Sequence, residues 1–342
     1  MSQTLAIIPA SENLEQHHIE SLPIVILHVH SRCNCRCTMC DIWQTRHTQE
    51  LAPQDLECML PSFATLGVRW VVLTGGEPLL HSNIAAICKP LRDRGIKVTL
   101  LTTGLLLSRH AKTAADLFDE IIVSIDGPAA VHNQIRRIPG AFERIAAGIA
   151  LLRRNATTIP LRARTTVQKA NHRHLCETVH AIQEMSLDSS SFLAADLTST
   201  AFNRELIWPV VRQNEIGLST DEVLALEVEV EALINRYQRE LENGFIVETP
   251  AKLRRLVQHF RAHLGLDPAC APVCTAPWHS AVIELDGSIR PCFFQPAVGN
   301  LTSRNLEAAL NDPQALRFRG ALDIPNDPIC KRCVCSLNYC ER

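Results

Sequence analysis

The alternation of short β-rich runs with helical stretches between residues 23 and 196 constrains the fold of this chain more than any other feature. Between the runs, apolar residues recur with the period of a helix. The β-rich runs are residues 23–30, 69–74, 97–101, 120–125, 161–167 and 190–195. Strands that alternate with helices predict a parallel sheet of right-handed βα units. The pattern leaves open whether six units close into a partial barrel or form a flat, doubly wound sheet.

Polar and reactive residues follow four of these runs, where each predicted strand ends. Because the carboxyl ends of parallel strands meet on one rim or edge in both architectures, these segments are expected to lie together. They are SRCNCRCTMC at residues 31–40, GGEP at 75–78, TTG at 102–104 and DGP at 126–128. The sequence therefore predicts one reactive rim.

The chain becomes helical after the sixth run. Ser219 and Glu222 form a capping box before a helix-period run that ends at Gly244. Pro250 then begins a second helix that runs to Leu264. This part is predicted to be a helical bridge.

The last part of the chain is predicted to be a separate small domain. Asp286-Gly287 between two apolar runs has the signature of a β-hairpin. A segment below about 80 residues rarely supplies enough core alone, so bound metal is expected to hold it together. The predicted division is residues 1–22 as an N-terminal lead, 23–215 as the α/β domain, 216–265 as the helical bridge and 266–342 as the C-terminal domain.

Composition and charge exclude several classes of function. Lys and Arg total 34 against 36 Asp and Glu, so the net charge gives no long-range attraction to nucleic acid or an anionic membrane. The N-terminal residues lack the pattern of a signal peptide, and no stretch approaches the about 18 apolar residues of a membrane span. We therefore expect a cytoplasmic protein with neither nucleic acid nor membrane as a partner.

Fourteen cysteines are informative in a reducing compartment, where thiols bind metal or serve catalysis more often than they form disulfides. Four fall within residues 33–40 and seven between residues 270 and 340. The other three, Cys58, Cys88 and Cys176, lie in helix-like contexts and are expected to be small buried hydrophobes. The histidines at the surface are expected to include His172.

Cys33, Cys37 and Cys40 have the spacing C-x3-C-x2-C. One turning loop can direct these three thiolates at a single centre. An iron-sulfur cube normally takes four protein thiolates, so three leave one iron open to a substrate or cofactor. Two alternatives stay open: a zinc site completed by His28, His30 or another cysteine, and inert packing of the thiols.

Three motifs in this order resemble the radical S-adenosylmethionine (radical SAM) superfamily: the three cysteines after the first strand, GGEP after the second, and SIDG at residues 124–127 after the fourth. The resemblance implies an α/β fold, namely a partial (β/α)6 TIM-like barrel. It also implies that Cys33, Cys37 and Cys40 hold a 4Fe-4S cluster whose open iron chelates S-adenosylmethionine (SAM). Reductive cleavage of SAM then yields a 5′-deoxyadenosyl radical that abstracts hydrogen from a substrate C–H bond.

The resemblance also assigns the residues that bind SAM. The GGEP motif would contact the methionine part through its backbone, and SIDG would contribute ribose-side contacts. A residue of the fifth strand would contact the SAM carboxylate. The implied residues are Gly75, Gly76, Glu77, Pro78, Ser124, Asp126 and Arg164.

Several neighbouring residues depart from the family pattern or stay open. The family usually has an aromatic residue before the third cysteine, where this chain has Met39, an apolar side chain that can still cover adenine. Cys35 fits no ligand position and is interpreted as a bystander. Arg136 and Arg137 either face SAM or the substrate, or form a solvated helix entry.

The C-terminal cysteines resemble the SPASM/Twitch auxiliary-cluster domain of the same superfamily. The stretch that carries this resemblance is CTAPWHSAVIELDGSIRPCFFQPAVGN, followed by a C-x2-C pair. It implies an auxiliary 4Fe-4S cluster on Cys274, Cys292, Cys330 and Cys333. Structural zinc on these thiolates is the alternative, and a cytoplasmic setting disfavours disulfides. The roles left open, and with them a second auxiliary cluster, are those of Cys270, Cys335 and Cys340.

We expect an enzyme of the oxidoreductase or transferase type that acts on a small molecule, with the auxiliary cluster assisting oxidation or rearrangement. The short segment before the first strand leaves no room for a peptide-recognition domain, which favours a small molecule. The alternatives are a maturase that cross-links or epimerises a ribosomally made peptide, and a non-catalytic Fe-S carrier or sensor. The resemblance implies an external one-electron reductant such as flavodoxin or ferredoxin. Expected substrate contacts are Asp196, Asn203, Arg204 and Trp208.

Overall fold

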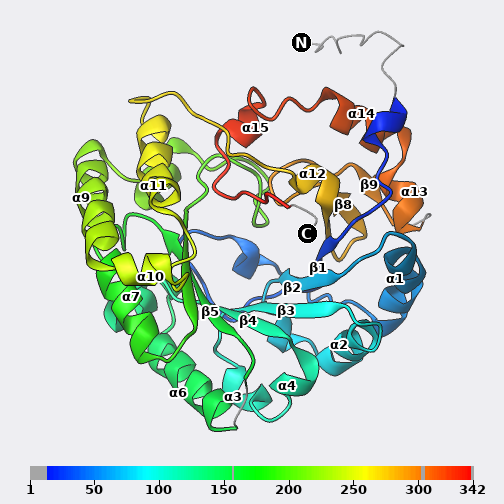
Figure 1. The fold of residues 1–342 in the computed structure, drawn as a ribbon, viewed down its shortest axis with the longest axis horizontal. Helices are drawn as coiled ribbons and strands as arrows, with labels where there is room; N and C mark the ends of the chain where they lie inside the picture. The colour runs from blue at the N-terminus through cyan, green and yellow to red at the C-terminus, as the bar shows by residue number, and fades with distance from the viewer. Residues whose placement is uncertain (1–13, 156–157, 302–304, 340–342) are drawn as a thin grey trace.

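Six parallel strands form a curved, open sheet in the computed structural model, which describes residues 14–155, 158–301 and 305–339. Each strand pairs with the next in sequence, and β6 is left at one edge. Figure 1 shows the strands curving inside an outer ring of helices. This arrangement confirms the predicted partial barrel over the flat sheet. The strands are β1 (Ile24–His30), β2 (Trp70–Gly75), β3 (Lys97–Thr102), β4 (Glu120–Ser124), β5 (Leu161–Val167) and β6 (Ser189–Ala194).

Helices fill the connections between these strands, as the periodicity predicts. The longer ones bury apolar residues at helical spacing against the outer face of the sheet. They are α1 (Pro53–Thr65), α2 (Ile84–Arg92), α3 (Leu107–His110), α4 (Ala114–Leu117), α5 (Ala129–Arg136), α6 (Ala141–Arg154) and α7 (Leu175–Glu184). Short 3-10 turns are η1 (Leu14–His17), η2 (Ile42–Gln44) and η3 (Pro78–Leu80).

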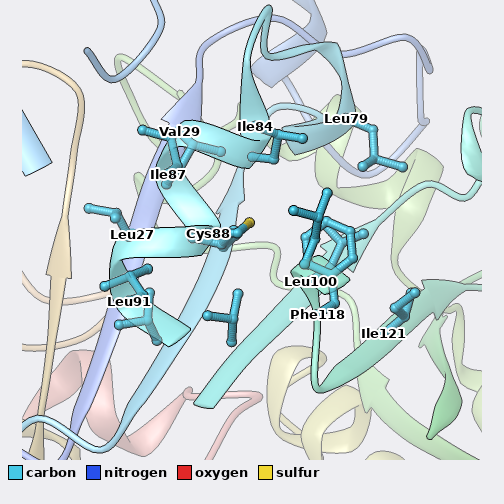
Figure 2. Packing of buried hydrophobic residues seen from close by; sticks show 14 of the residues in the cluster. Leu27, Val29, Leu79, Ile84, Ile87, Cys88, Leu91, Leu100, Phe118 and Ile121 are labelled. Atoms are coloured by element: carbon cyan, nitrogen blue, oxygen red, sulfur yellow. The ribbon is translucent and has the colours of Figure 1, made fainter. Parts of the chain in front are cut away.

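The main core lies between the strands and this outer ring. Alternate residues of β5 show why: its odd-numbered positions are buried, whereas Arg162, Arg164 and Thr166 are only partly buried and lie on the other face. Successive side chains of a strand point to opposite faces, so one face packs on helices and the other lines the barrel interior. Figure 2 shows part of this core, with residues of β1, β3 and β4 beside α2: Leu27, Val29, Leu100, Ile121, Ile84, Ile87, Cys88 and Leu91.

The C-terminal part extends the same sheet beyond β1. Strand β7 (Ser280–Ile283) pairs in parallel with β1, and β8 (Ser288–Arg290) and β9 (Gly299–Asn300) follow as antiparallel neighbours. The predicted hairpin at Asp286-Gly287 is therefore present, but its pairing with the first strand was not anticipated. The remaining helices here are α12 (Ala276–His279), α13 (Leu306–Leu310), α14 (Pro313–Ala321) and α15 (Pro328–Lys331).

The bridge consists of helices packed on α7 and β6. The predicted capping box is present: the Ser219 side chain accepts from the Glu222 backbone, and the Glu222 carboxylate accepts from the Ser219 backbone. A second buried cluster lies here and includes Leu226, Leu233 and Phe260. The helices are α8 (Val210–Ile216), α9 (Thr220–Arg236), α10 (Gln238–Glu242) and α11 (Pro250–His263). The division of the chain into domains stays a prediction.

Two minor expectations are wrong. Cys58 is exposed on the outer side of α1, although Cys88 and Cys176 are buried as predicted. His172 is buried in the loop after β5, where its Nδ1 lies 2.7 Å from the Lys169 carbonyl oxygen. No helix in the described ranges combines the length and hydropathy that crossing a bilayer requires.

Replacing Leu27 with alanine is expected to lower the free energy of unfolding by about 2–5 kcal/mol. Leu27 is fully buried in β1 and lies between Leu73 of β2 and Ile283 of β7, so the substitution leaves a cavity in the centre of the sheet. Denaturant unfolding at matched cofactor loading measures the loss. Leu224→Ala on the exposed side of α9 is the control and should change stability by about 0.5 kcal/mol or less. Equal effects of the two substitutions would contradict the described core.

Candidate functional site

The loop after β1 carries the first cysteines and is bound by the backbone of the loop after β2. The Gly76 N–H donates to the His30 carbonyl oxygen at 2.7 Å, and the Glu77 N–H donates to that of Arg32 at 2.9 Å. These bonds join the GGEP motif to the residues immediately before Cys33. The first two predicted rim segments are therefore in direct contact.

This contact requires glycine at two positions. A Cβ atom on Gly76 would lie 2.1 Å from the Arg32 carbonyl oxygen, and one on Gly75 would lie 2.6 Å from that of His30. Gly75 also has φ +114, which other residues rarely adopt. The glycines thus allow two backbone segments to approach closely enough to hydrogen-bond.

The Glu77 carboxylate is fully buried and faces the protein. It accepts hydrogen bonds from the Leu79 N–H at 3.0 Å, the Thr102 hydroxyl at 2.7 Å and the Thr103 N–H at 2.7 Å. The side chain therefore fixes the TTG segment to the GGEP segment. Pro78 begins η3 and is buried. The implied contacts of this motif with SAM stay predictions.

The other side of the cysteine loop is bound to the end of α5. The Arg36 N–H donates to the Arg136 carbonyl oxygen at 3.1 Å, and the Thr38 N–H donates to that of Ile135 at 3.0 Å. The Thr38 hydroxyl also donates to the Gln168 side chain at 2.8 Å. The loop is thus held from both sides by neighbouring elements of the rim.

Four thiols lie together in this loop. Cys35 and Cys37 are buried, and Cys33 and Cys40 are partly buried. Hydrogen bonds with Cys33 and Cys37, together with burial, raise the pKa of the Cys35 thiol, and the bond from Cys35 lowers the pKa of Cys37. Burial raises the pKa of Cys40 to about 12. Cys35 therefore lies among the predicted ligands, although the sequence pattern gives it no ligand position.

Asp126 and Arg136 form a buried ion pair behind these thiols. Asp126 is fully buried; one carboxylate oxygen lies 2.5 Å from Arg136 Nη2, and the other accepts from the Thr166 N–H at 2.9 Å. Arg136 Nη1 lies 3.4 Å from the Cys37 sulfur. Ser124 is partly buried on the inner face of β4. Arg137 is exposed, so the two arginines differ in environment.

Arg164 lies on the inner face of β5. Its Nε donates to the Ser191 hydroxyl at 3.3 Å. Its positive charge opposes the burial that raises the pKa of the Cys335 thiol. Arg164 therefore acts electrostatically on a C-terminal thiol, and its implied contact with SAM stays a prediction.

The segment after β6, residues 196–212, covers the cysteine loop and is called the roof segment below. Arg204 and Asp196 are 6% and 7% exposed and form an ion pair of 2.6 Å. Arg204 also donates to the Met39 carbonyl oxygen at 3.3 Å. These two predicted substrate residues therefore connect the roof segment to the loop.

The other two residues expected to bind substrate also contact the loop. Trp208 is 7% exposed, and its indole N–H donates to the Asp41 carboxylate at 2.5 Å. Asn203 donates to the Thr45 hydroxyl at 3.1 Å. The polar side chains of the roof segment thus form hydrogen bonds with other groups of the chain.

The roof segment also reaches the C-terminal part through aromatic contacts. Phe202 stacks on Phe293 with ring centroids 6.5 Å apart and meets Phe294 edge-on at 6.1 Å. The ring of His28 in β1 also lies near Phe293, with ring centroids 6.3 Å apart. Burial lowers the pKa of His28 to about 4, so this imidazole is neutral at physiological pH. Rings from three parts of the chain therefore contact one another here.

The C-terminal cysteines gather near the end of the chain. Gln295 donates to the Cys330 sulfur at 3.3 Å, and the Cys333 thiol donates to the Cys335 carbonyl oxygen at 3.0 Å. The negative charges of neighbouring thiolates act with burial to raise the thiol pKa values of Cys292 and Cys333. The thiols that interact in this way are Cys274, Cys292, Cys330, Cys333 and Cys335. Cys270 is exposed, and Cys340 lies outside the described residues.

A cavity of about 60 Å³ adjoins these cysteines. It lies between the end of β6, helix α11 and residues 331–336, and Cys333 and Cys335 form part of its wall. Basic residues line it: Lys252, Arg255, Lys331 and Arg332. None of the first four cysteines contributes to this cavity.

Within the described residues, every cysteine is free, and no three His, Cys, Asp or Glu side chains are arranged around a single metal ion. A cube of four irons is larger than one ion and takes thiolates at separate corners. The donor set of both cysteine groups is therefore suited to a cluster, because soft thiolates are the ligands that iron-sulfur clusters use.

Comparison with known proteins identifies both cysteine regions. The sequence model of the radical SAM superfamily matches residues 27–179, and that of the SPASM iron-sulfur cluster-binding domain matches residues 274–334. Both contain the cysteines that the sequence singles out. The matched residues thus cover the barrel from β1 to α7 and the C-terminal hairpin with its cysteines.

Similar proteins include enzymes with different names. The AdoMet-dependent heme synthase of Methanosarcina barkeri is 34% identical over 158 residues, which are 45% of each chain, so the match spans about half of that relative. The probable GTP 3′,8-cyclase of Metallosphaera sedula is 22% identical over 283 residues, 81% of each chain. Among solved structures, anSMEcpe with bound AdoMet and Cp18Cys peptide has a TM-score of 0.63 at 19% identity and covers 90% of this chain and 88% of that one. The structural likeness shows a shared fold.

Gly76→Ala is expected to reduce the iron bound per chain after anaerobic reconstitution. A methyl group at this position meets the Arg32 backbone at 2.1 Å and must displace the segment that leads into Cys33. Gly67→Ala is the control for the added methyl group, because no atom lies within 4 Å of it there. Gly67, unlike Gly76, has a positive φ, so any backbone strain falls on the control. Equal iron content in the two variants would show that the close approach does not position the cysteine loop.

The matches and the fold agree on the cofactors, which are SAM, the 4Fe-4S cluster that binds it and auxiliary iron-sulfur binding in the C-terminal part. The thiol groups of both regions fit these cofactors. The chain therefore belongs to the radical SAM superfamily and carries a C-terminal SPASM domain.

Proposed function

We propose that this radical SAM enzyme oxidises or rearranges a small molecule. Cys33, Cys37 and Cys40 would hold the SAM-binding cluster, and the auxiliary cluster would be bound by Cys274, Cys292, Cys330 and Cys333. The observation that carries the proposal is the roof segment, which binds the cysteine loop on one side and the C-terminal aromatic residues on the other. A covered barrel mouth suits a small substrate, because a reactive radical must be protected from water.

When bound by Cys33, Cys37 and Cys40, the iron-sulfur cluster would supply the electron for reductive cleavage of the C–S bond of SAM. The chain's own residues would bind and orient. The backbone of Gly75, Gly76 and Glu77 would face the methionine part, and Ser124 would face the ribose. The Asp126 carboxylate would act mainly by holding Arg136 and β5, since it is fully buried.

The names of the sequence relatives support a small substrate. The two relatives described above are named for synthesis of heme and cyclisation of GTP, both small molecules. Radical SAM enzymes also need a reductant, and we propose an external one-electron donor such as flavodoxin or ferredoxin. Oxidation of the substrate radical would release an electron, which the auxiliary cluster would accept.

A row of exposed apolar residues favours a second candidate function. Leu206, Ile207, Val210 and Val211 are between 53% and 79% exposed and lie on the roof segment and the start of α8. Contiguous exposed apolar residues are typical of interaction surfaces. A peptide substrate docking there would make the protein a peptide maturase.

Replacing Cys33, Cys37 and Cys40 together with alanine is expected to reduce iron from roughly 8 to roughly 4 per chain and to abolish 5′-deoxyadenosine formation from SAM. The physical reason is that only the open iron of the first cluster can chelate SAM. Iron, sulfide and zinc are measured after anaerobic reconstitution, and 5′-deoxyadenosine is measured after addition of dithionite.

Cys58→Ala on the exposed side of α1 is the control and should leave both values unchanged. Zinc in place of iron, or iron that the triple substitution does not reduce, would contradict the proposed ligands. Replacing Cys292 and Cys330 with alanine should remove the other half of the iron. Addition of SAM should still change the electron paramagnetic resonance spectrum of the remaining cluster.

Substrate size separates the two candidate functions. We expect an extract from which peptides and proteins have been removed to increase 5′-deoxyadenosine formation by the reconstituted enzyme, because a covered mouth admits only small molecules. The assay is repeated with a deuterated and an ordinary extract, and 5′-deoxyadenosine is analysed by mass spectrometry. Deuterium in this product would show that hydrogen is transferred from a substrate in the extract. Stimulation that is found only in the protein fraction and is destroyed by protease would favour the peptide maturase.

A further inference from the structure

A buried arginine lies against a cysteine of the first cluster site. Arg136 Nη1 is 3.4 Å from the Cys37 sulfur, and Arg136 is 7% exposed. Arginine is almost never buried unless it is paired. Its pairing here is on the far side, where Nη2 lies 2.5 Å from the Asp126 carboxylate. The guanidinium therefore lies between a thiolate ligand and a carboxylate.

The order of these charges defines a direction. The positive group contacts the sulfur, and the negative group lies behind it. In a buried, low-dielectric setting, charges at contact distance interact more strongly than in water. Negative charge added at the cysteine site is therefore closer to the Arg136 guanidinium than to the Asp126 carboxylate. The repulsion by Asp126 offsets only part of the attraction by Arg136.

The backbone prevents the guanidinium and the cysteine loop from moving independently. Arg136 is the last residue of α5, and its carbonyl oxygen accepts from the Arg36 N–H, next to Cys37. Asp126 is held by the Thr166 N–H. The contact between guanidinium and sulfur is thus built into the fold rather than left to a long, free side chain.

The neighbouring histidine does not compensate for the arginine. His132 is fully buried on α5, and its Nδ1 accepts from the Asp126 N–H at 3.2 Å. Burial and the charge of Arg136 lower the pKa of His132 to about 3, so it is neutral. Arg136 and Asp126 are therefore the two charges that set the field behind Cys37.

We infer that Arg136 sets the reduction potential of the SAM-binding cluster by stabilising its reduced form through Cys37. The inference rests on the proposed role of Cys37 as a ligand. Reduction moves one electron from the external donor to the cluster, and no bond in the protein forms or breaks. Hydrogen bonds to cluster sulfurs and the local net charge are among the factors that set such potentials. Arg136 is thus a positioning residue that acts through the ligand.

The test is a potentiometric titration of the anaerobically reconstituted full chain, without SAM or substrate, followed by electron paramagnetic resonance of the reduced clusters. The signal of the auxiliary cluster, recorded on the variant that lacks Cys33, Cys37 and Cys40, is subtracted. Arg136→Gln should make reduction of the first cluster at least tenfold less favourable, which is 59 mV lower for a one-electron couple.

A second variant predicts the opposite change. Asp126→Asn removes the carboxylate and leaves the cation, so the first cluster should become easier to reduce. A loss of structure would lower the iron content and cannot shift the two potentials in opposite directions. If Arg136→Gln does not bind iron, Arg136→Lys and Asp126→Asn provide the test, with a smaller downward and an upward shift expected.

Arg137→Gln is the matched control, because Arg137 is adjacent in sequence but exposed. It should titrate as the unmodified protein does. Full iron content with an unchanged potential in the Arg136 and Asp126 variants would overturn the inference. Iron binding that does not depend on Cys37 would instead contradict the proposed ligands, so the two failures are distinguishable.

Discussion

The rim of the barrel depends on a close approach between two backbone segments. Gly75 and Gly76 bring the loop after β2 within hydrogen-bonding distance of His30 and Arg32, immediately before Cys33. The opposite side of the cysteine loop is bound to the end of α5 in the same way. Backbone hydrogen bonds do not depend on side-chain rotamers, so the loop has a defined path before any cofactor binds. The positions of the thiols follow from that path.

Two buried ion pairs lie beside this loop, and each has to form correctly for the loop to assemble. Arg136 pairs with Asp126 beneath it, and Arg204 pairs with Asp196 above it. Removing one member of such a pair typically costs about 3–5 kcal/mol, because the remaining charge stays buried. A buried pair is nevertheless weak evidence for stability, because taking both charges out of water costs free energy that their attraction has to offset. Their placement next to thiolates that carry negative charge indicates an electrostatic role.

Much of the fold could be predicted because its signals are local. Hydrophobic runs located the strands of the barrel within a residue or two, and the capping box at Ser219 marked the start of α9. The GGEP motif could be assigned to the rim because it directly follows a predicted strand. The pairing of β7 with β1 had no such signal, because it depends on residues far apart in sequence.

The environment of the site was harder to predict for a related reason. The roof segment lacks helical period and carries polar and aromatic residues, which favoured a substrate-binding role for Arg204 and Trp208. In the structure, both bind backbone or side-chain groups of the cysteine loop. The sequence left open whether Arg136 faces SAM or the substrate or belongs to a solvated helix entry; it is instead the buried last residue of α5. Tertiary contacts decide both cases.

The pairing of β7 with β1 has a consequence for how the protein is made. Strand β1 lies between β2 and β7, so one of its edges stays open until residues near 280 have been synthesised. An open strand edge is prone to pair with other chains. The first cysteines emerge from the ribosome about 300 residues before Cys330 and Cys333. A nascent chain would therefore present the first cluster site, beside an unprotected edge, well before the second site exists.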